Sequence, residues 1–458
     1  MAATPAPGAH AHWSSRFGFL MAAIGSSVGL GNFWRFPYTA GENGGAAFIL
    51  IYLVCILFIG FPILMAELSV GRYGQASAIG SVAKVAKDNG SRRGWVSIGL
   101  AGMIGGILIL CFYSVVAGWV SAYIVKMFTG EFTGQESEVV AAAFGSFTEN
   151  SNQVLFWHTA FMLLTIWVVS KGVTGGIERA ASILMPVFFI MLLGMVGYAM
   201  IAGDAGAAFN YLFSVDLSEI TPATFLAAVG QAFFSIGLGS AIMITYGSYL
   251  DKDANIGQSA GIISLADTGV ALIAGLAIFP FVFAFPGIEP TAGPALFFQA
   301  LPSAFAQMPA GEIVGTAFFA LALIAALTSS ISLLQAVVAW AEENSSWSRG
   351  TIAWVFGGFI WLVGTGVVYS MAFFDLLDFI SGSIALPLAG LLMAVFMGWV
   401  VSKEIARSQL SQASPRLFFF FRISMKFIAP IALTVILVLG LDDRFGFGIS
   451  EALFGAAG

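Results

Sequence analysis

Long apolar runs alternate with short polar connections along the whole chain. A helix needs about 20 consecutive, mostly apolar residues to cross a bilayer. The predicted membrane spans cover residues 17–39, 44–71, 94–128, 153–170, 176–202, 223–250, 257–285, 312–342, 350–371, 376–402 and 417–440. This pattern predicts an all-α polytopic membrane protein with about 11 transmembrane helices.

Two of these spans are interrupted by the same three residues. Gly29-Leu30-Gly31 lies in the first span, and Gly237-Leu238-Gly239 lies in the sixth, about half a chain later. A broken helix in a membrane leaves backbone polar groups without partners, which is costly unless ions or a polar solute bind them. Matched breaks in the two halves of a chain therefore indicate the binding site of a secondary transporter.

The composition excludes an ordinary soluble protein, because 59% of the residues are hydrophobic and only 9% are charged. If the N-terminus is cytoplasmic, most Lys and Arg residues fall on the inner side and only Arg35, Lys126 and Arg444 fall on the outer side. An odd number of spans then places the C-terminus outside. The polar start leads directly into a full span, so we expect no cleavable signal peptide.

Other functional classes find little support in the sequence. The net charge of −6 comes from acidic outer loops, and no basic tail indicates a nucleic-acid partner. A membrane enzyme would need a nucleophile beside a base or a metal cluster, and the three histidines lack metal-ligand spacing. A channel would need charged rings or a repeated filter, and neither is visible. We therefore expect a transporter, not an enzyme.

Several motifs occur along the chain. The first is the run Gly-Leu-Gly-Asn-Phe-Trp-Arg-Phe-Pro at residues 29–37. The others are Glu42-Asn43-Gly44-Gly45, Glu67 with Gly71-Arg72-Tyr73-Gly74, Lys171-Gly172 with Gly176-Ile177-Glu178-Arg179, and Leu327-Thr328-Ser329-Ser330. These motifs and their order resemble the neurotransmitter:sodium symporter family, which is itself the standard example of transporters with broken helices.

The resemblance implies the leucine-transporter fold, a 5+5 inverted repeat with unwound helices 1 and 6. It divides the chain into a cytoplasmic tail (1–16), a first repeat (17–202), a second repeat (223–402), and an eleventh helix with the C-terminal tail (417–458). Bacterial members often lack the twelfth helix of their relatives. We therefore expect a multi-pass protein of the plasma (inner) membrane of a bacterium, surrounded by membrane lipid.

The resemblance also implies two sodium sites, for which oxygen ligands are suitable because sodium is a hard cation. The first site maps to Ser27, Asn32, Ser235 and Asp267, and the carboxylate of the substrate would complete it. The second maps to the carbonyls of Gly25, Val28 and Ala325 and the hydroxyls of Thr328 and Ser329. The alternative is that these two hydroxyls bond only to their own helix. The two broken spans favour the sodium site.

Asp267 departs from the chloride-dependent members of the family. The resemblance maps their chloride pocket to Tyr52, Gln231, Ser235, Asp267 and Ala271, with serine at the Ala271 position and often asparagine at the Asp267 position. An ionisable residue in mid-membrane indicates a function by default. A fixed negative charge here would replace chloride, so we expect no chloride requirement and proton antiport on the return step. The alternative is a structural ion pair, but span 7 offers no nearby Lys or Arg.

Gly29 indicates the substrate class. Monoamine-transporting relatives carry aspartate at this position, whereas glycine leaves room for a carboxylate to reach the amides of Leu30 and Gly31 at the positive end of a half-helix. Tyr113 corresponds to a family tyrosine that donates to this carboxylate. The resemblance therefore implies a zwitterionic amino acid as substrate.

The pocket for the substrate side chain maps to Ser26, Ile109, Phe234, Gly237, Ser240, Ser329 and Leu333. Gly237 and Ser240 are small, which favours a bulky hydrophobic or aromatic amino acid. Neighbouring side chains could refill the space, and a GABA-like, glycine-like or other small amino acid is the alternative.

Two gates follow from the same resemblance. Outside, Arg35 and Asp378 match the ion pair of the family, above a lid formed by Tyr113 and Phe234. Inside, Trp13 and the acid Glu343 match the family pattern, but His10 stands where relatives carry arginine.

Overall fold

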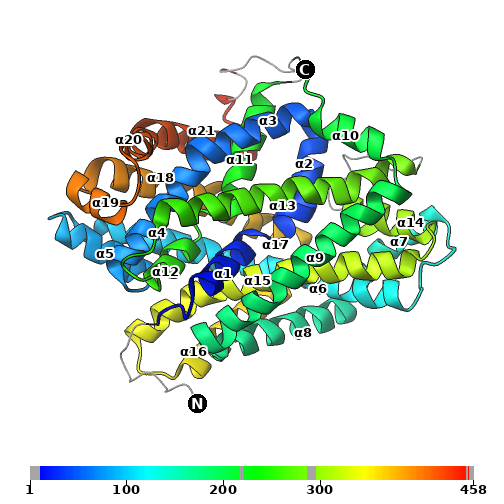
Figure 1. Ribbon diagram of the computed structural model, residues 1–458. Coiled ribbons are helices and arrows are strands. Elements are labelled where there is room, and N and C mark those ends of the chain that lie inside the picture. The colour runs from blue at the N-terminus through cyan, green and yellow to red at the C-terminus, as the bar shows by residue number, and fades with distance from the viewer. Residues whose placement is uncertain (1–10, 217, 219, 286–294, 450–451, 453–458) are drawn as a thin grey trace.

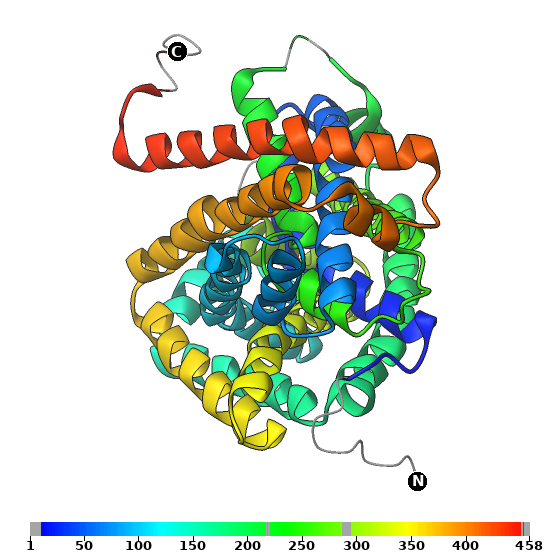
Figure 2. The same cartoon turned by 90° about the vertical axis from the view of Figure 1, so that its left-hand side faces the viewer.

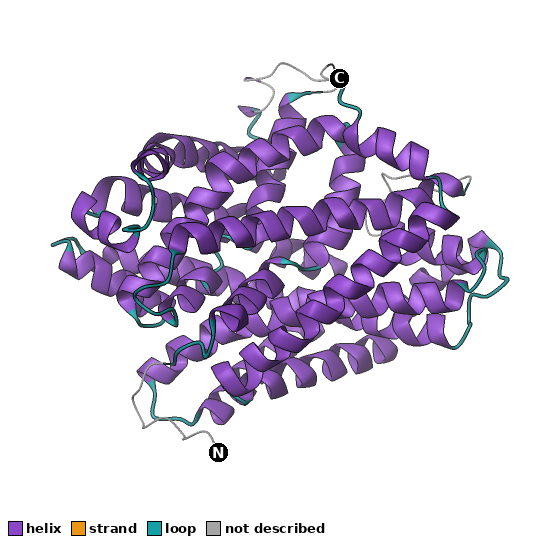
Figure 3. Ribbon diagram, viewed as in Figure 1, coloured by secondary structure: helices purple, strands orange, loops and turns teal. Residues whose placement is uncertain are grey.

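In the computed structural model, residues 11–216, 218, 220–285, 295–449 and 452 are described, and all of their regular elements are helices (Figure 3). The helices of the first half are α1 (Arg16–Ser27), η1 (Gly31–Arg35), α2 (Phe36–Glu42), α3 (Ala46–Cys55), η2 (Ile56–Gly60), α4 (Phe61–Gly74), α5 (Ala78–Asp88), η3 (Arg93–Val96), α6 (Ser97–Phe128), α7 (Ser137–Glu149), α8 (Ser151–Ser170), η4 (Val173–Glu178), α9 (Arg179–Ala202) and α10 (Ala205–Phe213).

The second half of the described chain is also helical. Its helices are α11 (Pro222–Ile236), α12 (Ile242–Ser248), α13 (Ile256–Ala284), η6 (Leu296–Ala300), α14 (Leu301–Ala306), α15 (Gly311–Asn344), α16 (Arg349–Tyr369), α17 (Met371–Asp378), η7 (Phe379–Ala385), α18 (Leu386–Val395), η8 (Phe396–Val400), α19 (Lys403–Gln409), α20 (Pro415–Ile423), η9 (Ser424–Ile428) and α21 (Ala429–Phe445). The elements η2, η4 and η6–η9 are π-helical turns within or beside longer helices.

The helix boundaries agree with the predicted spans to within about five residues. Nine helices of the described chain are long and apolar enough to cross a membrane, and α1 with η1–α2 makes a tenth when the bent pair counts as one span. The predicted sixth span is divided into α11 and α12, of 15 and 7 residues, and each is too short to cross alone. The two spans that the sequence predicts to be broken are therefore the two that the structure divides.

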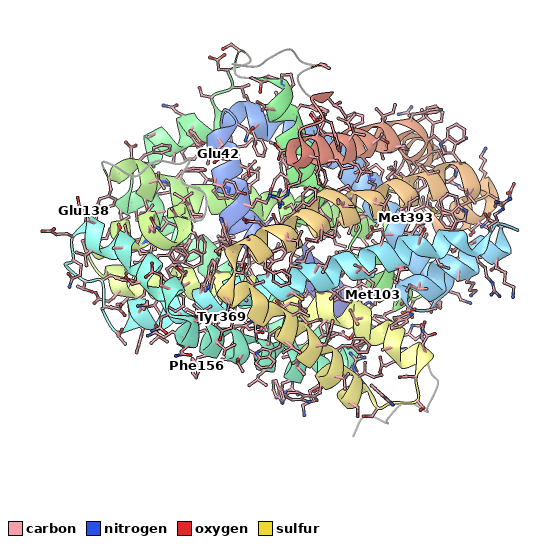
Figure 4. The ribbon with its side chains drawn as sticks, turned by 180° about the vertical axis from the view of Figure 1, so that it is seen from behind. Glu42, Met103, Glu138, Phe156, Tyr369 and Met393 are labelled. Atoms are coloured by element: carbon pink, nitrogen blue, oxygen red, sulfur yellow. The ribbon has the colours of Figure 1, made fainter. Side chains whose placement is uncertain are left out.

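The centre of the bundle is formed by α6 and α15, the two longest helices, which run side by side (Figure 1). Most of their apolar surface is buried, whereas α9, α16 and the α20–α21 segment keep large side chains at the outside. Phe156, for example, is 63% exposed and lies at the rim of the bundle (Figure 4). Lipid chains would cover these residues, because exposed apolar surface costs nothing in a bilayer.

Short helices outside the spans mark the two ends of the molecule. Figure 1 shows α5 and α19 at one end and α7 and α14 at the opposite end. Helix α21 lies against α18 on one side of the bundle (Figure 2). The N-terminal segment before α1 lies at the end that holds α12, where Trp13 contacts Tyr246 and Tyr249.

Candidate binding site

The first break separates α1 from η1 by three residues. Val28 adopts an extended conformation, and the helix resumes after a bend of 48°. The amide of Gly29 donates to Asn32 Oδ1 at 2.9 Å, and the amide of Leu30 donates to Tyr113 Oη at 3.2 Å. A Cβ atom on Gly29 would lie only 2.8 Å from Ser329 Oγ, so the packing leaves no room for a side chain there.

The second break lies between α11 and α12. Gly237, Gly239 and Ala241 have φ angles of 71°, 75° and 65°, in the left-handed region that glycine adopts most easily. The amide of Gly239 donates to Oε1 of Glu67 at 2.8 Å, and Glu67 is buried within α4. The carboxylate therefore supplies a partner for a backbone group that the broken helix leaves free.

The two breaks contact each other and α13 through a network of polar side chains. Ser27 Oγ lies 3.3 Å from the carbonyl oxygen of Ile236, the last residue of α11. Asn32 Nδ2 donates to Asp267 Oδ1 at 2.9 Å and to Ser235 Oγ at 3.2 Å. Ser235 Oγ in turn donates to Asp267 Oδ2 at 2.7 Å. Side chains of the predicted first sodium site are thus brought together from three spans.

Asp267 is fully buried, and no Lys, Arg or His in the described chain forms an ion pair with it. Its negative charge is met by the neutral donors of Asn32, Ser235 and Tyr52. Tyr52 Oη approaches Ser235 Oγ at 3.5 Å, and Ala271 is buried one turn further along α13. The structural ion pair that the sequence left open as an alternative is therefore absent from the described residues.

Gln231 differs from the rest of the predicted chloride pocket. Its Nε2 atom donates weakly to the carbonyl oxygen of Gly31 at 3.4 Å. Its buried Oε1 atom has no hydrogen-bond partner among the described residues. Gln231 thus contacts the first break directly.

A cluster of oxygen atoms surrounds Ser329, where α15 meets the end of α1. Ser329 Oγ lies 3.4, 3.3 and 3.3 Å from the carbonyl oxygens of Gly25, Ser26 and Val28, and 3.1 Å from that of Ala325. A hydroxyl carries one hydrogen and can donate to only one of these oxygens at a time. The cluster therefore has more acceptors than donors, which is the arrangement that a bound cation would stabilise.

Thr328 stands beside this cluster. Its hydroxyl lies 3.1 Å from the carbonyl oxygens of both Ile324 and Ala325 on its own helix. The structure therefore contains the local bonding that the sequence offered as an alternative, together with the oxygen cluster around Ser329. No group of three or more His, Cys, Asp or Glu side chains in the described chain could hold a metal ion, so a cation here would depend on carbonyls and hydroxyls.

A small cavity of about 60 Å³ lies between the two breaks, α6 and α15. Its lining includes every residue that the sequence predicts for the substrate, listed here in chain order: Ser26, Ser27, Leu30, Gly31, Ile109, Tyr113, Phe234, Ser235, Gly237, Ser240, Ser329 and Leu333. Gly29, which the sequence places beside the carboxylate of the substrate, also lines it, as do Ile242 and Leu386, which were not predicted. Leu386 belongs to α18, and no pattern in the sequence indicates that it lines the cavity.

Two larger cavities lie beyond Phe234, towards the end that holds α7 and α14. Their volumes are about 190 and 320 Å³, and both are lined by Arg35, Tyr38, Phe234 and Asp378. The guanidinium of Arg35 lies 4.3 Å from the centre of the Phe234 ring. Arg35 and Asp378 thus share a vestibule without forming an ion pair in this conformation.

The opposite approach to the cavity is occupied by the N-terminal segment. Trp13 is buried, and its Nε1 atom donates to the carbonyl oxygen of Tyr246 at 3.1 Å. Ser14 donates through its amide and its hydroxyl to Glu178, at 2.9 and 2.6 Å. Glu343 accepts a hydrogen bond from the amide of Ser77. His10 lies outside the described residues.

The chain is similar to known proteins over most of its length. The model of the Sodium:neurotransmitter symporter family matches residues 10–143 and 147–445. An uncharacterized sodium-dependent transporter of Bacillus subtilis, YhdH, is 37% identical over 438 residues, covering 93% of this chain and 96% of the relative. A sodium-dependent neutral amino acid transporter of Bos taurus, B(0)AT2, is 27% identical over 298 residues, covering 58% of this chain and 40% of the relative.

Among solved structures, the chain is similar to MhsT in complex with L-phenylalanine. The TM-score is 0.87 and the identity is 40%, covering 94% of this chain and all of that chain.

Proposed function

The chain belongs to the sodium:neurotransmitter symporter family, and on this premise we propose that it imports a zwitterionic amino acid together with sodium by alternating access. It is a multi-pass membrane transporter and not an enzyme, and its family uses sodium. The observation that carries the proposal is the oxygen cluster around Ser329 beside two broken helices. Counterflow of labelled amino acids in proteoliposomes tests it. We expect uptake in sodium and background uptake after complete replacement by potassium.

The carboxylate of the substrate would bind at the first break. Leu30 and Gly31 line the cavity at the start of a half-helix, where the helix dipole favours an anion. Tyr113 lies within hydrogen-bond distance of Leu30 and can donate to the same carboxylate. This carboxylate would complete the sodium site formed with Ser27, Asn32, Ser235 and Asp267, so that the two solutes bind cooperatively.

The second sodium would bind at the carbonyls of Gly25, Val28 and Ala325 and the hydroxyls of Thr328 and Ser329. The distances of 3.1–3.4 Å from Ser329 Oγ to these carbonyls support the assignment. Because the site joins α1 to α15, sodium bound there would hold these two helices together.

For the side chain of the substrate we propose a bulky hydrophobic or aromatic group. Gly237 and Ser240 leave space beside Ile109 and Leu333, and the similar protein MhsT was solved with L-phenylalanine. A second candidate is a small amino acid, because Ile242 and Leu386 narrow the cavity to about 60 Å³. A binding panel of phenylalanine, tryptophan, leucine, alanine, glycine and GABA distinguishes the two candidates.

Ile109→Trp is expected to weaken phenylalanine binding about tenfold or more, because filling a packed site costs ~1–3 kcal/mol. Binding of alanine should change much less.

Gly237 is unsuitable for this test because its φ of 71° would strain any larger residue. Competition binding in detergent measures both affinities. Ile104→Trp, on the exposed face of α6, is the matched control. An equal loss for alanine and phenylalanine would contradict the proposed pocket.

The two ends of the binding site would open in turn. We propose that the N-terminus is cytoplasmic and the C-terminus is outside, in the inner membrane of a bacterium. The vestibule lined by Arg35 and Asp378 then faces outward, and the Trp13 contacts close the inner side. An ion pair between Arg35 and Asp378 would form when the outer side closes. Glu343 would release Ser77 when the inner side opens.

Trp13→Ala is expected to open the inner side, because removing a buried tryptophan costs ~3–5 kcal/mol of packing. A cysteine placed at Ser332, one turn along α15 from the oxygen cluster, should then react more than about tenfold faster with a water-soluble thiol reagent. Cys55 and Cys111 are replaced by alanine in the background. Trp347→Ala, which removes a tryptophan that is 55% exposed, is the control. Unchanged labelling after Trp13→Ala would show that Trp13 does not hold the inner side closed.

A further inference from the structure

A groove with four cations lies between α19 and the segment formed by α20 and η9, far from the binding site. Its volume is about 610 Å³. The lining consists of the cations Lys403, Arg407, Arg422 and Lys426 with the apolar residues Pro415, Phe418, Phe419 and Ile423. Figure 1 shows α19 and α20 at the same end of the molecule as α5.

The four cations have no carboxylate partner in the described chain, because none of them forms a salt bridge there. The guanidinium of Arg407 lies 5.0 Å from the centre of the Phe418 ring, and its Nη1 atom is buried without a hydrogen-bond partner among the described residues. A buried donor without a partner is costly, above all on a charged group. The groove therefore has free positive charge and a buried donor that an anion from outside the chain would satisfy.

Arg422 and Lys426 leave some of their hydrogen-bond donors unused within the chain. Arg422 donates to the carbonyl oxygen of Met397 at 2.7 Å, which ties α20 to the end of η8. The ammonium of Lys426 lies 5.1 Å from the centre of the Trp399 ring. These contacts hold the cations beside the groove and leave further donors available to a ligand.

The surroundings of the groove distinguish a lipid from a small soluble anion. Phe419, Phe427 and Trp399 are 66%, 51% and 60% exposed, on helices that belong to the last two spans. Exposed aromatic residues beside Lys and Arg are typical of the boundary between the acyl chains and the headgroups. A lipid would match this surface, because its phosphodiester would bind the cations and its acyl chains would cover the exposed aromatic rings.

We propose that this groove binds the headgroup of an anionic glycerophospholipid in the inner leaflet. The assignment to the inner leaflet depends on the proposed orientation of the chain. The binding of the lipid itself is independent of the sodium and amino-acid sites. Arg407 and Lys426 would contact the phosphate from opposite sides of the groove, and Lys403 would neutralise its outer face. Basic pockets between helices at the cytoplasmic side are suited to such headgroups.

Titration of the purified full chain in detergent, followed by native mass spectrometry, tests the proposal. We expect phosphatidylglycerol to bind more than about tenfold tighter than phosphatidylcholine. Arg407→Gln with Lys426→Gln should reduce phosphatidylglycerol affinity about 25-fold, at about fivefold for each cation removed. Lys403→Gln, which changes an exposed side chain and so preserves the packing, should reduce it about fivefold.

Arg92→Gln with Arg93→Gln is the matched control, because both residues are exposed at the start of η3 and lie outside the groove. It removes the same charge and should change the affinity less than about twofold. An equal loss in this control would show general attraction to positive charge and overturn the proposal. Displacement of phosphatidylglycerol by inorganic phosphate would also overturn it, since the groove would then be a site for small anions only.

Discussion

Replacing Thr328 and Ser329 together by alanine is expected to abolish sodium-dependent amino-acid uptake in proteoliposomes. Ser329 Oγ lies within 3.4 Å of the carbonyls of Gly25, Val28 and Ala325, so the change removes two hydroxyl ligands from one cation site. A contact with a charged group contributes about 1.5–3 kcal/mol, and two such losses reduce sodium affinity more than about 100-fold.

The Thr328 hydroxyl bonds only to carbonyls of its own helix, and the Ser329 hydroxyl can donate to only one of its neighbouring carbonyls at a time, so the variant should remain folded. Ser330→Ala is the matched control. Ser330 is the next residue of α15, and its buried hydroxyl has no hydrogen-bond partner among the described residues. Its uptake should equal that of the wild type. Normal sodium-driven uptake by the double variant would place the coupling site elsewhere.

Transport is expected to be independent of chloride, and Asp267→Asn with Ala271→Ser is expected to make it chloride-stimulated. Asp267 is fully buried and accepts hydrogen bonds from the neutral side chains of Asn32, Ser235 and Tyr52, so its charge lacks a cation in the described chain. A buried carboxylate without a counter-charge costs several kcal/mol. A sodium ion bound beside it would remove this cost, and the carboxylate would serve where other members use chloride.

The same argument predicts proton antiport. When sodium leaves towards the cytoplasm, Asp267 would take up a proton and carry it outward on the return step. Uptake should therefore continue when gluconate replaces chloride, and a pH dye trapped in the vesicles should report a rise in internal pH during sodium-driven uptake. In the double variant, the pH change should disappear and chloride should increase the uptake several-fold.

Ala271→Ser alone is the control for this experiment, because it adds the hydroxyl one turn from Asp267 and keeps the carboxylate. It should remain independent of chloride. Strong loss of wild-type uptake in gluconate would show that Asp267 does not replace the anion.

The spans and the two breaks could be predicted from the sequence because they depend on properties of short segments. A run of apolar residues long enough to cross a bilayer has few alternatives to a helix, since every backbone polar group must be bonded within the chain. The breaks at residues 29–31 and 237–239 follow from glycine, and Gly237 and Gly239 do adopt left-handed backbone. The residues predicted for the pocket all line one cavity, and they were mapped from the resemblance of the whole chain to one family.

Other features depended on contacts between distant parts of the chain. Glu67 bonds the Gly239 amide across 172 positions, and Leu386 reaches the cavity from α18. Neither contact leaves a local pattern, because each results from how separate helices pack. The separation of Arg35 from Asp378 and the contacts of Trp13 belong to one conformation of the protein. The same sequence adopts other conformations as well, so the sequence does not tell which of these contacts are present.

The sequence by itself determined the class of the protein, its spans and the place of both breaks, and it predicted the residues of the candidate site. The tertiary structure decided which side of the site is open, which side chains narrow the cavity, and that the cations of residues 403–426 share one groove. The physical reason is that hydrophobicity and backbone freedom belong to individual residues. The shape of a cavity and the partner of a buried charge arise only when helices from distant positions pack together.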